Sequence, residues 1–98
     1  MGHQRARSAD ADLDDIWYYV AKESGSFDRA DSFVAPLTDR FYLLARTPYI
    51  GRARDDLRAG LRTFSAGQYV IIYRIADEDV IIPHVLHGSR DIESFFHH

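Results

Sequence analysis

The sequence predicts an α+β fold with an N-terminal edge strand and an antiparallel helical hairpin packed on a small antiparallel sheet of three C-terminal strands. The sheet is predicted by residues 61–91, where β-branched and aromatic side chains alternate with the period of two of a pleated strand. The hairpin is predicted by two apolar stripes of helical spacing that are separated only by a short turn. A chain of 98 residues can bury one core, so we expect a single domain over residues 1–98.

Composition excludes several classes of protein. The chain is 46% hydrophobic and 28% charged, which is typical of a globular domain and not of a disordered one. It has no cysteine, which rules out disulfides and thiolate chemistry. Without a membrane-length apolar run or a signal-peptide pattern, we expect a soluble, cytoplasmic protein that does not engage a membrane. The net charge of −3 argues against nucleic-acid binding through a globally basic surface.

The first helical pattern follows a weakly apolar N-terminus that is at best an edge strand. Ser8 is a suitable N-cap, and Gly25 supplies the stop. The buried stripe is predicted to consist of Ala9, Leu13, Ile16, Trp17 and Val20.

The second helical pattern begins near Ser26 or Asp28 and ends at Thr47, which precedes a proline. Pro36 lies inside it and would forgo one backbone hydrogen bond. We therefore expect a kink or a break near residues 32–36.

Turn residues divide residues 61–91 into strands. Gly67 separates the first two strands, and an acidic run at 77–79 separates the second pair. Pro83 cannot donate to a central ladder, so the last strand either lies at an edge there or carries a bulge. After this strand, Ile92, Phe95 and Phe96 form a short apolar tail segment that is expected to cover the sheet or the hairpin.

No cofactor or metal site is expected. His84 and His87 stand three residues apart on a predicted strand and therefore point to opposite faces. The acidic residues at 10–15 fail as a calcium loop, because the position that requires glycine is Asp15 and the twelfth position is Ala21. No glycine-rich phosphate loop, nucleophile elbow or Cys/His pair is present.

Arginine is concentrated between the second helix and the strands. Its planar fork suits carboxylate and phosphate groups. Two interpretations remain open, a solvated loop paired to nearby acids and a surface for an acidic partner. The residues concerned are Arg46, Arg52, Arg54, Arg58 and Arg62.

Five short fragments, taken together, resemble the ParE/RelE toxin superfamily, and they lie closer to its ParE branch. They are DLDDIWYY at 12–19, PYIGR at 48–52, LRAGLR at 57–62, YVIIYR at 69–74 and VLHGSRD at 85–91. The resemblance covers nearly the whole chain in the right order. It implies the toxin of a type II toxin–antitoxin pair, neutralised by a small ParD-like antitoxin with which it would form a hetero-oligomer.

The resemblance implies two possible targets. ParE-like members inhibit DNA gyrase and so block replication, whereas RelE-like members cut messenger RNA on the ribosome. An RNase needs groups that activate the ribose hydroxyl and stabilise the phosphorane. The matching positions would be Arg62, Arg74, His87 and Arg90. No tyrosine follows Tyr73, so we favour a non-enzymatic gyrase inhibitor without sequence-specific DNA binding of its own; an inactive antitoxin-binding module is a third alternative.

Binding residues are expected on two surfaces. Exposed sheet edges can accept a strand and helical hairpins can accept an amphipathic helix, so the antitoxin is expected near the hairpin and the arginines. Its predicted contacts are Trp17, Arg46, Arg52, Arg54, Arg58 and Tyr73. The predicted target contacts are His87, Arg90, Phe95 and Phe96.

Overall fold

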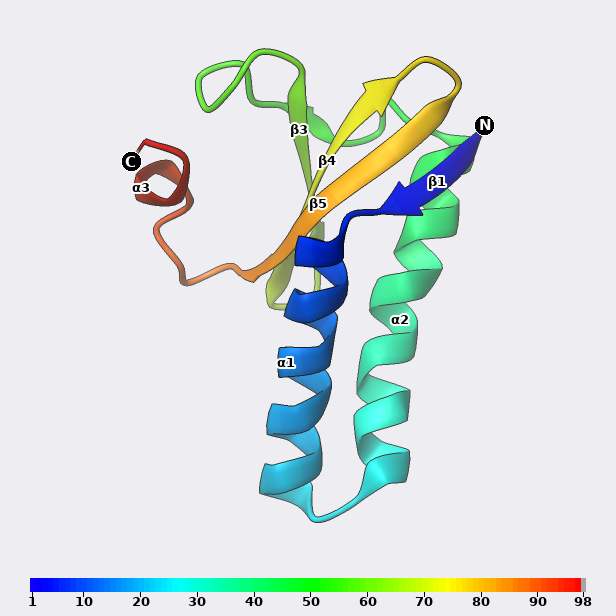
Figure 1. The fold of residues 1–98 in the computed structure, drawn as a ribbon, viewed down its shortest axis with the longest axis vertical. Coiled ribbons are helices and arrows are strands. Elements are labelled where there is room, and N and C mark those ends of the chain that lie inside the picture. The colour runs from blue at the N-terminus through cyan, green and yellow to red at the C-terminus, as the bar shows by residue number, and fades with distance from the viewer. Residues whose placement is uncertain (98) are drawn as a thin grey trace.

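The chain folds into a helical hairpin packed against one face of a five-stranded sheet (Figure 1). The structure, a computed structural model, describes residues 1–97. None of the helices in these residues combines the length and apolarity that a membrane crossing needs. The elements are β1 (Gly2–Arg5), α1 (Arg7–Ser24), α2 (Phe27–Arg46), β2 (Arg52–Ala53), β3 (Leu61–Ala66), β4 (Tyr69–Ala76), β5 (Asp79–His87) and α3 (Ile92–Phe96).

The sheet has the strand order β1-β5-β4-β3-β2. The three predicted C-terminal strands are confirmed as an antiparallel meander, and β1 is the predicted edge strand. The prediction of a purely antiparallel three-stranded sheet is wrong, because β1 pairs parallel to β5 and the two-residue β2 adds to β3. Neither pairing has a local sequence signal. For β1 and β5 the reason is their separation in the chain, because the helical hairpin and the first strands of the meander lie between them.

Backbone caps define the helical hairpin. Gly25 ends α1 in the left-handed conformation with φ of 67°, as predicted. Ser26, one of the two predicted starting points of the second helix, caps α2 by accepting a hydrogen bond from Arg29 N. The assignment of Ser8 as the N-cap of α1 is wrong, because the cap position is Ala6 and has no side-chain bond. Ser8 Oγ instead donates to the carbonyl of Pro83 at 2.6 Å and so fastens α1 to β5.

The predicted break in α2 is not observed. The helix runs without interruption from Phe27 to Arg46 and contains Pro36. Leu37 and Phe41 are buried on its sheet-facing side, and this packing holds the helix across the missing N–H of the proline.

Pro83 occupies a bulge in β5. Ile72 pairs with His84 and Arg74 pairs with Ile81, so two residues of β5 stand opposite Tyr73. Just beyond the bulge, Asp12 Oδ2 accepts hydrogen bonds from Val85 N at 3.0 Å and from His84 Nδ1 at 2.9 Å. This carboxylate attaches α1 to the re-aimed strand.

Two hydrophobic clusters cover the two faces of the sheet. The larger lies under the hairpin and includes Phe41, Leu44, Ile71, Tyr73 and Ile82, all fully buried. The smaller lies on the opposite face, where the predicted apolar tail forms α3 and packs on the sheet. Its members are Leu57, Leu61, Ile72 and Leu86, flanked by Val70, Ile92, Phe95 and Phe96.

Candidate functional site

Tyr73 fixes the loop that connects α2 to β2, called here the 48–51 loop. Its hydroxyl accepts a hydrogen bond from Gly51 N at 2.9 Å and donates one to the carbonyl of Pro48 at 2.8 Å. The side chain is fully buried, so it offers no surface to a partner. Its position is therefore at odds with the predicted antitoxin contact, and its role is to hold the loop.

Arg62 fixes the same loop from β3. Its Nη2 donates to the carbonyls of Tyr49 at 3.0 Å and Gly51 at 2.6 Å, and its guanidinium lies over the Tyr49 ring. Arg62 stands directly opposite Tyr73 in the sheet, so the two side chains share a face and act on the loop together.

Gly51 makes this arrangement possible. A Cβ at this position would collide with Tyr73 Oη and come within 2.7 Å of the Thr63 carbonyl. The glycine of the PYIGR fragment is thus required by close approach of the loop to the sheet.

The other arginines of this stretch differ in their surroundings. Arg46 and Arg52 are exposed and form no ion pair with residues 1–97. Arg54 makes two bonds of 3.0 and 2.9 Å to Asp56, and these lower the pKa of that carboxyl. Arg58 lies 5.4 Å from the centroid of the Phe96 ring. Arg46 and Arg52 are therefore the cations available to an acidic partner.

The four candidate RNase residues do not form one site. Arg62 pairs with Tyr73 beneath the hairpin, whereas Arg74 pairs with Leu61 on the opposite face. A single phosphorane cannot be contacted by both guanidinium groups through opposite faces of a sheet.

The side chains of His87 and Arg90 contact different neighbours. His87 Nδ1 lies 2.7 Å from Ser89 Oγ, and its ring packs edge-on against Tyr69 on the hairpin side of the sheet. Arg90 lies over the Phe95 ring at 4.6 Å. His84 packs against Phe95 on the other face, and no group of three or more metal-ligating side chains occurs in residues 1–97.

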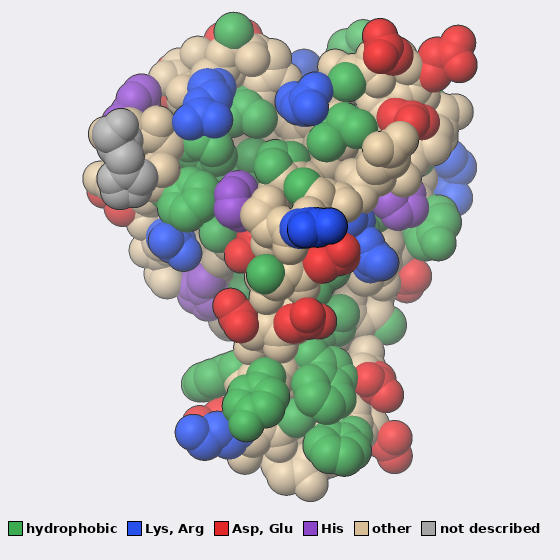
Figure 2. Space-filling model, in the orientation of Figure 1, with side chains coloured by type: hydrophobic (Ala, Val, Ile, Leu, Met, Phe, Trp, Pro, Cys, Tyr) green, Lys and Arg blue, Asp and Glu red, His purple; other side chains and the backbone are tan. Residues whose placement is uncertain are grey.

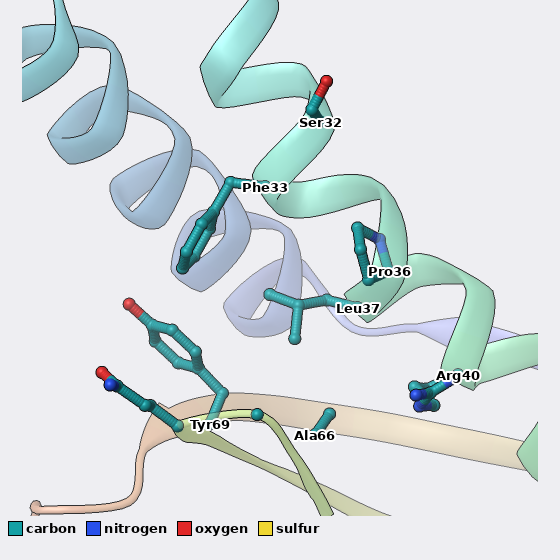
Figure 3. Close-up of a pocket in the computed structure, with 9 residues that line it drawn as sticks. Ser32, Phe33, Pro36, Leu37, Arg40, Ala66 and Tyr69 are labelled. Atoms are coloured by element: carbon teal, nitrogen blue, oxygen red, sulfur yellow. The ribbon is translucent and has the colours of Figure 1, made fainter.

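A groove runs between α2 and the β3–β4 turn, and we call it the hairpin groove (Figure 3). Phe33 and Leu37 point from α2 towards Tyr69, which projects from the sheet to face them. Phe33 and Tyr69 meet edge to face at 6.0 Å, and burial, with Tyr19 nearby, raises the pKa of Tyr69. The cavity has a volume of about 410 Å³ and is mostly apolar. Its lining is Ser32, Phe33, Pro36, Leu37, Arg40, Ala66, Gly67, Gln68 and Tyr69.

Aromatic side chains also gather at the end of the hairpin farthest from the sheet (Figure 2). Tyr18, Tyr19 and Phe27 are 69%, 63% and 73% exposed. Trp17 stacks on Phe27 at 5.4 Å and donates from Nε1 to Asp31 at 2.7 Å. Trp17 is half-buried and not fully buried as the predicted stripe of the first helix had it, so part of its side chain remains at the surface. An apolar surface of this kind is typical of a protein-docking site.

Asp91 makes the docking of α3 sensitive to acid. Its carboxylate caps the helix by accepting from Ser94 N, and this bond is the main cause of the lowered pKa of Asp91. A carboxyl with a lowered folded pKa stabilises the fold above its unfolded pKa, and the effect is lost as pH falls through the folded pKa. We expect amide protection in α3 to fall on acidification while that of β4 persists, as measured by hydrogen exchange.

Asp91→Asn is the matched control, because asparagine caps helices without titrating. Protection of α3 in this variant should not depend on acid. An equal acid response in both proteins would contradict the assignment.

Comparisons with known proteins agree with these features. The family model described as "ParE toxin of type II toxin-antitoxin system, parDE" matches residues 4–92. Toxin ParE1 of Caulobacter vibrioides is 37% identical over 89 residues, which cover 91% of each chain. Toxin ParE1 of Mycobacterium tuberculosis is 34% identical over 87 residues, which cover 88% of each chain.

The chain belongs to the ParE toxin family. It is the toxin component of a type II toxin–antitoxin system, and the ParE branch suggested by the sequence fragments is confirmed. The fold of this ParE-family chain also matches a structure titled "Chromosomal ParDE TA system from P. aeruginosa", with a TM-score of 0.77 and 21% identity over 89% of this chain and 95% of that one.

Two surface features of this ParE-family toxin were missed from sequence. Phe33 and Tyr69 line the hairpin groove together, although they lie on different elements that no local sequence signal connects. Tyr49 and Ile50 belong to the PYIGR fragment, and they are 72% and 52% exposed. The sequence signal for this exposed surface was the presence of two consecutive large apolar residues in a turn region.

Proposed function

We propose that this ParE-family toxin inhibits DNA gyrase without catalytic chemistry of its own and is neutralised by a ParD-like antitoxin bound to it in a hetero-oligomer. The observation that carries the proposal is the separation of Arg62 and Arg74 on opposite faces of the sheet. Together with family membership, this favours action by docking over RNA cleavage.

The antitoxin is proposed to dock along the hairpin. An amphipathic helix of the partner would place its apolar side chains in the hairpin groove and against the exposed aromatic surface that includes Trp17. Arg46 and Arg52 would attract acidic residues of the antitoxin and raise the association rate. Arg54 and Arg58 contribute less in this arrangement, because Asp56 and Phe96 already engage them.

The gyrase contacts are proposed at the C-terminal end. His87 and Arg90 are exposed, and Arg90 lies over Phe95 in front of the α3 segment. Phe95 and Phe96 are half-buried against the smaller cluster, so α3 presents a compact aromatic surface. Figure 1 places α3 away from the hairpin. The proposed gyrase-binding surface therefore lies apart from the proposed antitoxin-binding surface.

The order in which synthesis stops in cells tests this function. After induction without antitoxin, labelled thymidine incorporation should fall before labelled methionine incorporation, and co-expression of the antitoxin should prevent growth arrest. Loss of protein synthesis first, with cleaved transcripts, would contradict the proposal and favour the RelE-like alternative. Normal growth would instead favour the inactive binding module.

Phe33→Asp is expected to weaken antitoxin binding by about 30-fold or more, because it places a carboxylate in the apolar groove at a central aromatic contact. Isothermal titration with the cognate ParD-like antitoxin measures the effect. Tyr42→Asp is the matched control, because Tyr42 is an exposed aromatic residue of the same helix that faces β1 and contacts His3. Equal affinities for both variants would contradict docking in the hairpin groove.

A further inference from the structure

The 48–51 loop holds two large apolar side chains in solvent. Tyr49 is 72% exposed and Ile50 is 52% exposed, although the loop lies directly beside the sheet. A loop of this length could turn its apolar residues inward or carry polar ones. Its adjacent exposed tyrosine and isoleucine instead resemble the aromatic and aliphatic anchors of protein interfaces.

The backbone beneath these side chains is fixed at every residue. Tyr73 binds the loop at its first and last residues, and Arg62 binds the carbonyls of Tyr49 and Gly51. Ile50 N donates to the carbonyl of Thr47 at 3.1 Å. A partner would therefore meet preformed anchors and would not have to order the loop on binding.

Positive charge flanks the anchors on both sides. Arg46 ends α2 just before the loop, and Arg52 begins β2 just after it. Both are exposed and have no ion pair within residues 1–97. Beside Ile50, a second hollow of about 380 Å³ is also lined by Arg52 and Arg54.

We infer that the 48–51 loop is a preformed docking anchor for an acidic, partly apolar segment of the antitoxin. The inference rests on the proposed neutralisation by a bound antitoxin, and it assigns to that partner a contact separate from the hairpin groove. A duplex DNA backbone would satisfy Arg46 and Arg52 but would offer no apolar surface to Ile50. An acidic peptide with apolar side chains satisfies the charge and the exposed pair together.

The test measures binding of the full chain to the cognate ParD-like antitoxin. The double variant Tyr49→Ala/Ile50→Ala should raise the Kd by about 30-fold or more, mainly through faster dissociation. Its thermal stability should fall only slightly, through loss of the exposed contact between the Tyr49 ring and Arg62. Tyr42→Ala, which removes an exposed aromatic side chain at the β1 side of α2, should bind like the unaltered chain. Arg46→Ala/Arg52→Ala should slow association and reduce its dependence on salt.

Several outcomes would overturn the inference. An unchanged Kd for Tyr49→Ala/Ile50→Ala, with tight binding by the unaltered chain, would remove the anchor while leaving neutralisation by the antitoxin intact. Absence of antitoxin binding by the unaltered chain would instead remove the proposed function. Tighter binding to a 20-base-pair duplex than to the antitoxin, lost in Arg46→Ala/Arg52→Ala, would show that the surface serves nucleic acid.

Discussion

Gly51→Ala is expected to lower the free energy of unfolding by about 3 kcal/mol, which combines overpacking with loss of nearby hydrogen bonds. The new Cβ would collide with the Tyr73 hydroxyl, which is fully buried and cannot move into solvent. It would also press on the Thr63 carbonyl, which belongs to a strand and is equally fixed. The loop must lift from the sheet, and the bonds from Tyr73 and Arg62 must lengthen or break.

Thermal unfolding measures this effect. For a domain of this size, a loss of 3 kcal/mol corresponds to a decrease in Tm of roughly 12 to 24 °C. A Tm within a few degrees of the unaltered chain would contradict the packing described for Gly51.

Tyr73→Phe is expected to lower the free energy of unfolding by about 2 kcal/mol. The ring can keep its packing, but Gly51 N and the Pro48 carbonyl lose their partner, and the N–H belongs to a buried residue. Leaving such groups unpaired costs more than the net value of the bonds themselves. Denaturant unfolding of the variant gives the measurement.

Tyr49→Phe is the matched control, because it removes a hydroxyl from an exposed ring in the same loop. Its stability should stay within about 0.5 kcal/mol of the unaltered chain, as is usual for surface changes. Gly51→Ala combined with Tyr73→Phe should cost less than the sum of the single changes, since removing the hydroxyl removes the closest of the three clashes and leaves those with the Thr63 carbonyl and Tyr73 Cε1. If the losses of unfolding free energy were strictly additive, a Cβ at residue 51 would not clash with the Tyr73 hydroxyl.

The elements that local signals specify were predicted well. Gly25, Ser26 and the pair Thr47 and Pro48 define the hairpin through caps and backbone restrictions that depend only on neighbouring residues. The same holds for the meander, whose turns carry Gly67 and an acidic pair. Partners that are remote in sequence were not predictable. Ser8 resembled an N-cap until the carbonyl of Pro83, 75 residues away, was placed beside it.

The candidate functional residues show the same contrast between local sequence signals and partners that are remote in sequence. An arginine cluster is visible in the sequence, but whether each arginine is free depends on what the fold brings near it. Arg62 resembled a catalytic or binding cation, yet it is engaged by two loop carbonyls. Tyr73 was a predicted antitoxin contact, yet it faces the hairpin and is fully buried. Arg46 and Arg52 remain candidate contacts for an acidic partner, as predicted, because no carboxylate pairs with them within residues 1–97.

A supercoiling assay with purified gyrase tests the account most directly, because it contains no ribosome, no transcript and no other cellular factor. Titration of the purified chain should inhibit supercoiling, addition of the antitoxin should restore it, and Arg74→Ala should inhibit as the unaltered chain does. Undiminished supercoiling at every toxin concentration, with transcript cleavage in a ribosome-containing reaction that Arg74→Ala abolishes, would contradict it.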